Sequence, residues 1–180
     1  MKVKTLVLSL IAVALILAGC QKTPAPTMQS VVNAKGYKEA SLIGMKLQWK
    51  FDGQDLEIVL TAPTTGWVAI GFDPSTMMKD ANFILAYVKD GQVSAIDQYG
   101  SQLTNHSPDT TLGGTDDVTA VSGSDDGNTT EVTLRIPANS GDKYDHALAP
   151  GEEHTVLLAY GPKDDFETQH TARGKLKLIL

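Results

Sequence analysis

Two adjacent methionines, Met77 and Met78, stand in a polar connection between two apolar segments. Core methionines fill gaps inside strands or helices, whereas a methionine in a loop is either exposed without a role or a soft metal ligand. A lone histidine is more often structural, but methionine and histidine together are one axial ligand pair of haem iron. The chain offers four histidines for such a pair, namely His106, His146, His154 and His170.

Other chemistry has little support in the sequence. It contains no G-x-S-x-G, no H-E-x-x-H and no glycine-rich phosphate loop, so we expect an electron-transfer or binding domain rather than an enzyme. The segment Asp125-Asp126-Gly127-Asn128 resembles a calcium loop in composition but lacks EF-hand spacing, and we interpret it as a hairpin turn. No C-x-x-C-H segment is present, so a haem would be held noncovalently.

The first twenty residues have the three regions of a secretion signal. Lys2 and Lys4 precede an uncharged apolar run over 5–17 that is too short to span a membrane. The letters LAGC at 17–20 match the bacterial lipobox, so we expect removal of residues 1–19 and acylation of Cys20, with chains such as palmitate. Several acyl chains anchor a protein durably, because each buried methylene contributes roughly 0.8 kcal/mol.

These features predict a location and exclude some partners. Cys20 is the only cysteine, so once acylated it leaves no thiol for a disulfide or a thiolate metal site. Loss of the two lysines of the signal takes the formal net charge from −6 to −8, which disfavours nucleic acid as a partner. We expect a lipoprotein anchored in the cell envelope and facing the periplasm or exterior. Gln21 in place of Asp favours the outer membrane if the host has one, and 20–36 is interpreted as a flexible tether.

The rest of the chain has a hydrophobic period of two. Apolar and polar residues alternate over 45–51, 56–61 and 132–136, as in strands buried on one face. The segments 67–72 and 83–88 are apolar on both faces, which is typical of central strands. Four further strands are expected over 93–99, 118–122, 155–160 and 176–180.

Turn residues separate these runs. Asp52-Gly53, Asp90-Gly91 and Asp126-Gly127 are strong hairpin signals, and no stretch has helical periodicity with a start and a stop. We therefore predict an all-β domain over 37–180, an antiparallel β-sandwich of about nine strands. Two longer polar segments, in which binding function often lies, cover 100–115 and 138–153.

An ordered set of motifs resembles the DOMON domain family. The letters GWVAIGF at 66–72, followed by Met78 and by KDAN at 79–82, are similar to the family's GW-x-x-x-GF strand and M-x-x-A-D motif. HTARG at 170–174 is similar to its H-x-x-R-G motif near the C-terminus. The likeness spans 44–180 and continues through Asp90-Gly91, Asp97-Gln98-Tyr99, the strand of Arg135, and Leu158-Ala159-Tyr160-Gly161.

The resemblance implies an immunoglobulin-like β-sandwich that, in the cytochrome members, binds one b-type haem between a methionine and a histidine. Carried over motif by motif, the axial ligands are Met78 and His170. Asn82 stands where the family usually has Asp, which affects the hydrogen bonding expected around the methionine loop. Other members lack the ligand pair and bind sugars, so the presence of both residues favours the haem branch.

A Met/His pair fills both axial positions, which suits electron transfer rather than oxygen activation, and the thioether favours Fe(II). Arg173 is a candidate partner for a haem propionate, although an exposed edge arginine is an equally good interpretation. Candidate wall residues, each of which also suits an ordinary core, are Trp67, Phe72, Phe83 and Phe166.

The leading hypothesis is therefore a membrane-anchored b-type haem protein that relays single electrons in the cell envelope to an unknown redox partner. The alternative is a binding module that holds a sugar or other small ligand on the same sandwich without haem. Exposed aromatic platforms would favour that alternative, and the candidates are Tyr99, Tyr144 and Tyr160. A structural or assembly role is a third class that no feature singles out.

The lipobox leads to a prediction about anchoring. Cys20→Ser removes the acylated thiol, so we expect the variant to remain unprocessed or to lose its lipid. Phase partitioning in detergent measures this, with wild-type protein in the detergent phase. Wild-type protein found in the aqueous phase would contradict the lipoprotein interpretation.

Overall fold

The computed structural model describes residues 27–28 and 31–180. The predicted signal, its cleavage site and Cys20 lie outside the described residues. No helix among the described residues is long and apolar enough to cross a membrane.

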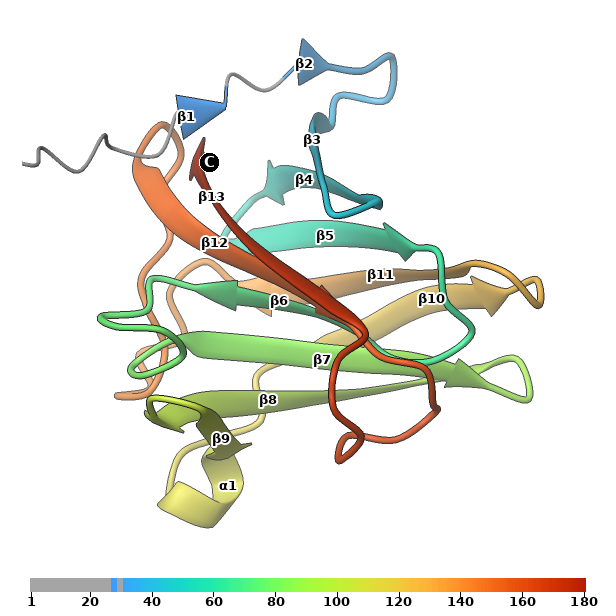
Figure 1. Cartoon of the computed structure of the whole chain (residues 1–180). Helices are drawn as coiled ribbons and strands as arrows, with labels where there is room; N and C mark the ends of the chain where they lie inside the picture. The colour runs from blue at the N-terminus through green and yellow to red at the C-terminus, as the bar shows by residue number, and fades with distance from the viewer. Residues whose placement is uncertain (1–26, 29–30) are drawn as a thin grey trace, which may run out of the picture.

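Two β-sheets pack face to face (Figure 1). One sheet has seven strands in the order β1-β13-β12-β6-β7-β8-β9, and the other has six in the order β10-β11-β5-β4-β3-β2. All neighbours are antiparallel except β1 and β13, so the predicted all-β antiparallel sandwich is confirmed. The elements are β1 (Thr27–Met28), β2 (Val31–Val32), β3 (Lys38–Leu42), β4 (Met45–Asp52), β5 (Asp55–Ala62), β6 (Val68–Phe72), β7 (Asn82–Lys89), β8 (Gln92–Gln102), β9 (Asn105–Pro108), α1 (Asp109–Leu112), β10 (Thr119–Asp125), β11 (Thr130–Pro137), β12 (Glu153–Tyr160) and β13 (Ala172–Ile179).

The turns form where the sequence predicts them. Asp90 and Gly91 both have positive φ, 52° and 75°, between the paired residues Lys89 and Gln92, as a tight hairpin of right-handed strands requires. In the segment 125–128 the aspartate side chains accept hydrogen bonds from backbone N–H groups of the same turn. The Gly127 N–H donates to Asp125 Oδ1 at 2.7 Å, and the Asn128 N–H donates to Asp126 Oδ1. This segment is therefore a hairpin turn.

The space between the sheets holds the main hydrophobic core. Its largest side chains, each less than 2% exposed, include Trp49, Phe72 and Leu158. A second, smaller apolar cluster lies on the other face of the seven-stranded sheet and contains Trp67, Ala69, Ala81, Phe83 and Leu85. Since side chains alternate along a strand, β6 and β7 supply residues to both clusters, which explains why their sequences are apolar throughout.

Phe72 provides a test of this arrangement, because it is 1% exposed in the main core. We expect Phe72→Ala to lower the free energy of unfolding by about 3–5 kcal/mol, since it removes buried apolar surface and leaves a cavity. Urea denaturation measures the change. The control Phe51→Ala, at a partly buried position on β4, should cost less. Equal losses in the two variants would contradict the placement of Phe72.

Candidate cofactor-binding site

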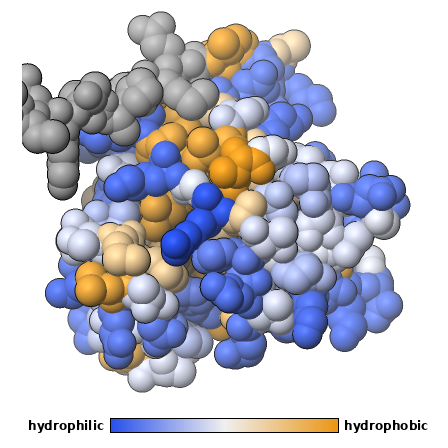
Figure 2. All heavy atoms as spheres, viewed as in Figure 1, coloured by the Kyte–Doolittle hydropathy of each residue, from blue (hydrophilic) through white to orange (hydrophobic). Residues whose placement is uncertain are grey.

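Two adjoining pockets open on the outer face of the seven-stranded sheet, with volumes of about 310 Å³ and 600 Å³. Both volumes fall in the range of about 300–1,000 Å³ typical of small-molecule and cofactor sites. On the face shown in Figure 2, apolar side chains reach the surface beside strongly hydrophilic ones over the β12 and β13 region. Four residues line both pockets, namely Met77, Met78, His170 and Arg173.

The register of the sheet explains which residues form the floor. Phe83 on β7 pairs with Gly71 on β6 and with Gln98 on β8, so these residues share the outer face. A Cβ at residue 71 would lie 2.4 Å from the Phe83 ring, so the ring needs the space that glycine leaves. Across the other strands the same face carries Leu85, Ile96, Leu157, Ala159, Arg173 and Lys175.

Met78 lies in a tight turn between β6 and β7, formed by residues 75–80 and called here the methionine turn. The Lys79 N–H donates to the Thr76 carbonyl at 3.0 Å, and the Ser75 N–H donates to the Lys79 carbonyl at 2.9 Å. Met77 has a φ of 56° and is 50% exposed, whereas Met78 is half-buried. The turn therefore directs the two adjacent methionines into different environments.

Hydrogen bonds clamp this turn onto β8. The Asp80 N–H donates to the Gly100 carbonyl at 2.8 Å, and the Gly100 N–H donates to the Ala81 carbonyl at 2.8 Å. The contact is so close that a Cβ on Gly100 would lie 1.7 Å from the Met78 carbonyl oxygen. Only glycine fits there, so β8 fixes the position of the Met78 backbone.

The Asp80 side chain reinforces the clamp. Its carboxylate accepts hydrogen bonds from the hydroxyls of Ser75 and Tyr99, and these bonds lower the pKa of Asp80. The His146 Nε2–H donates to the Asp80 carbonyl at 2.7 Å. The methionine turn is thus held from both its backbone and its side chains.

His170 lies at the other side of the pockets, two residues before β13. The Trp67 indole N–H donates to the Thr168 carbonyl at 2.9 Å, and the Thr171 N–H donates to the Tyr160 carbonyl at 2.7 Å. Trp67 therefore lines the larger pocket and also holds the loop that carries His170. Within the described part of the chain, no hydrogen bond or ion pair involves the half-buried imidazole of His170.

The other three histidines have partners. His106 lines the larger pocket, bonds to Gln98 through Nδ1, and its ring centroid lies 5.4 Å from that of Phe83. Burial lowers the pKa of His106, so its ring is neutral near pH 7. His146 is bound to the methionine turn, and His154 Nδ1 lies 2.6 Å from Asp73 Oδ2.

The structure brings most of the predicted wall residues together. Trp67, Phe83, Phe166 and Arg173 each line at least one pocket. Phe72 does not, because its side chain points from β6 into the main core between the sheets, and its assignment to the cofactor wall is corrected. Further pocket residues, which the sequence patterns do not assign to the wall, include Leu85, Ile96, Gln98, His106, Leu157 and Lys175.

The three candidate aromatic platforms lie outside both pockets. Tyr99 and Tyr144 contact each other with ring centroids 4.9 Å apart, and their hydroxyls bond to Asp80 and to the Leu112 carbonyl. Tyr160 packs against the main core. These contacts give each ring a structural role.

The close approach at Gly100 leads to a prediction. Gly100→Ala would force the Met78 carbonyl to move, so we expect a loss of roughly 1–3 kcal/mol in the free energy of unfolding. Ser94→Ala, on the same strand, should change it little. Urea denaturation of both variants is the measurement, and a Gly100→Ala variant as stable as wild type would mean that the turn is not clamped as described.

The fold is similar to those of known proteins, and the sequence is similar to a known family. The cytochrome b domain of pyranose dehydrogenase from Coprinopsis cinerea has a similar fold, with a TM-score of 0.61, 11% identity, and coverage of 82% of this chain and 85% of that one. The cytochrome domain of Myriococcum thermophilum cellobiose dehydrogenase is also similar, with a TM-score of 0.60 and 10% identity. The match covers 84% of this chain and 88% of that one. No curated protein matches the chain. Residues 44–161, more than half of the sequence, match the DOMON domain, and the chain belongs to this family.

Proposed function

We propose that the protein is a membrane-anchored b-type haem protein that relays single electrons in the cell envelope, with Met78 and His170 as the axial ligands. One observation carries this proposal. The two residues are far apart in sequence, yet both line the same pair of adjoining pockets. The similar folds of two cytochrome domains support the same function.

The residues present fit a haem. The donor set is a thioether and an imidazole, and His170 is the histidine that structural hydrogen bonds leave available. The floor is apolar, with Phe83, Leu157 and Ala159 in the smaller pocket, as a hydrophobic macrocycle requires. Arg173 and Lys175 at its rim would pair with propionate carboxylates.

A haem held by Met78 and His170 would supply reversible one-electron chemistry. The residues of this chain would hold it noncovalently and set its environment. The clamped turn keeps Met78 in place, and Trp67 fixes the loop of His170. Neutral His106, bonded to Gln98, closes one wall of the larger pocket without adding charge.

The anchoring part of the proposal rests on the sequence. The lipobox at 17–20 would hold the domain close to the membrane surface, because few residues separate it from β1, which pairs with β13. A tethered domain meets membrane-bound donors or acceptors at a high effective concentration, which suits a relay.

One feature favours the alternative function of a sugar or small-ligand binding module. The larger pocket carries amide and hydroxyl side chains of the kind that bind sugar hydroxyls, namely Gln98, Thr104, Asn105, Thr168 and Gln169. The smaller pocket, where the apolar floor lies, has no comparable set of amides and hydroxyls among its lining residues.

Substitutions of the two proposed iron ligands test the haem proposal. Wild-type protein reconstituted with haem should give a low-spin six-coordinate b-type absorption spectrum, because two strong ligands close both axial positions. Met78→Ala should retain haem but become high-spin or bind water, with a lowered reduction potential, since the thioether favours Fe(II). His170→Ala should weaken haem retention more, because imidazole is the stronger ligand in both oxidation states.

Matched controls separate ligation from general damage to the pocket. Met77→Leu and His106→Ala alter residues that also line the pockets, yet both should keep the low-spin spectrum. His154→Ala, outside the pockets, should do the same. If the protein takes up no haem, or if the Met78 and His170 variants have unchanged spectra, the haem proposal fails and the binding module takes its place.

A further inference from the structure

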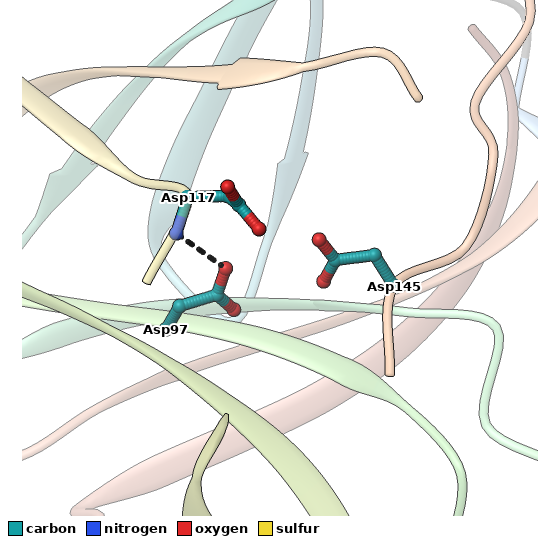
Figure 3. Close-up of side chains that lie close together, drawn as sticks. All are labelled: Asp97, Asp117 and Asp145. Atoms are coloured by element: carbon teal, nitrogen blue, oxygen red, sulfur yellow. Dashed lines mark hydrogen bonds between the residues drawn. The ribbon is translucent and has the colours of Figure 1, made fainter. Parts of the chain in front are cut away.

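Three aspartates from separate segments, one buried and two half-buried, converge on the opposite face of the seven-stranded sheet from the two pockets. Asp97 lies on β8, Asp117 precedes β10, and Asp145 lies in the connection between β11 and β12. One carboxylate oxygen of each lies within 4.8 Å of those of the other two. The three side chains point toward a common centre (Figure 3).

Buried oxygen atoms without hydrogen-bond partners among the described residues lie at this centre. Asp97 is only 2% exposed, and its Oδ2 accepts the Asp117 N–H at 3.3 Å. Its Oδ1 is buried and has no hydrogen-bond partner among the described residues. Asn82, 4% exposed, donates through Nδ2 to Asp145 Oδ1 at 2.5 Å, and its own Oδ1 is also buried without a partner.

A fourth carboxylate adds to the same environment. Asp109, at the start of α1, is 1% exposed, and its Oδ1 is likewise unpartnered among the described residues. Burial, followed by the neighbouring carboxylates, raises the pKa of Asp97 to about 8 and that of Asp109 to about 7. None of the ion pairs formed by the described residues brings a positive charge to these aspartates.

The donor chemistry selects a class of ion. Carboxylate and amide oxygens are hard ligands, which suit Ca²⁺ and Mg²⁺ rather than the softer transition metals. Ca²⁺ binds oxygen at about 2.3–2.6 Å, so one ion spans donors up to about 5 Å apart, and it accepts the irregular geometry of ligands from several segments. Mg²⁺ needs shorter distances and a near-ideal octahedron.

We propose that Asp97, Asp117 and Asp145 form a calcium-binding site. Beside it, Asn82 is hydrogen-bonded to Asp145, and the carboxylate of Asp109 acts electrostatically on Asp97. The bound ion joins β8 to the segment before β10 and to the connection between β11 and β12. Next to Asp145, His146 bonds to the Asp80 carbonyl, so the ion also braces the back of the methionine turn. The site is separate from the two pockets and does not depend on haem.

Thermal unfolding of the purified full-length protein, without added haem, tests this site. We expect 10 mM Ca²⁺ to raise Tm over that in EDTA by roughly 3–10 °C, if the dissociation constant is about 10⁻⁴–10⁻³ M, as in extracellular calcium modules. The same concentration of Mg²⁺ should give a smaller rise. Isothermal titration with Ca²⁺ measures the binding directly.

Variants assign the effect to this cluster. Asp97→Asn and Asp145→Asn should abolish the Ca²⁺-dependent rise and the titration signal. In EDTA, Asp97→Asn should be at least as stable as wild type, because it removes one of several crowded carboxylates. Asp90→Asn is the matched control, since it makes the same change at an exposed hairpin position where Asn tolerates the positive φ.

Three results would overturn the proposal. The first is a wild-type protein whose Tm and titration do not respond to Ca²⁺. The second is an equal response in wild type and in both cluster variants, which would locate the ion elsewhere. The third is a Mg²⁺ response as large as that to Ca²⁺, which would reject calcium as the ion. Because no measurement involves haem, each is independent of the spectra that test the proposed function.

Discussion

The seven-stranded sheet buries apolar side chains on both of its faces, and the rest of the structure depends on this constraint. On its inner face, residues such as Phe72 and Ile84 complete the core of the sandwich. On its outer face, Phe83 and Leu85 form a floor that the six-stranded sheet cannot cover. Loops must cover this floor instead, and the pockets form between those loops and the sheet.

The loops that carry Met78 and His170 are each fixed to a different strand of that sheet. The methionine turn is hydrogen-bonded to β8 at Gly100. The loop before β13 accepts a hydrogen bond from the indole of Trp67, next to β6. Both contacts require glycine, at Gly100 on β8 and at Gly161 directly after β12. A Cβ would lie 1.7 Å from the Met78 carbonyl oxygen at the first position and 2.2 Å from the Trp67 indole nitrogen at the second. The relative position of Met78 and His170 is therefore set by strand register rather than by the loops alone.

Much of the fold was predictable because hydrophobic period and turn chemistry are local signals. All nine expected strands correspond to strands of the structure, from β4 to β13, and the hairpin at Asp90-Gly91 closes as expected. Hydrophobic period and turn residues do not predict β1, β2, β3, β9 or α1. These are short elements, most of them at sheet edges, where alternation is too brief to detect and pairing decides the structure.

The candidate site was predictable only in part, because membership of a pocket depends on which face a residue occupies. Trp67 and Phe83 line the pockets. Phe72 lies on the inner face, because side chains alternate along β6 and its neighbour Gly71 shares the outer face with Phe83. Asn82 was expected to affect the methionine turn, yet its side chain bonds to Asp145 on the inner face, and Asp80 holds the turn instead. The aspartate cluster combines residues from distant segments, so no local spacing could reveal it.

The rigid attachment of the two loops would have a consequence for the electron-transfer kinetics of the proposed haem site. When the charge on a bound group changes, the surrounding dipoles and ligands must adjust, and the free energy of that adjustment slows electron exchange. Here the backbone on one side is held against Gly100 with no room to shift, and on the other side it is tied to a buried indole. Ligands held in place before the charge changes need little adjustment. In the proposed haem protein, the clamped turn would therefore favour a small reorganisation energy and rapid electron exchange with a small driving force.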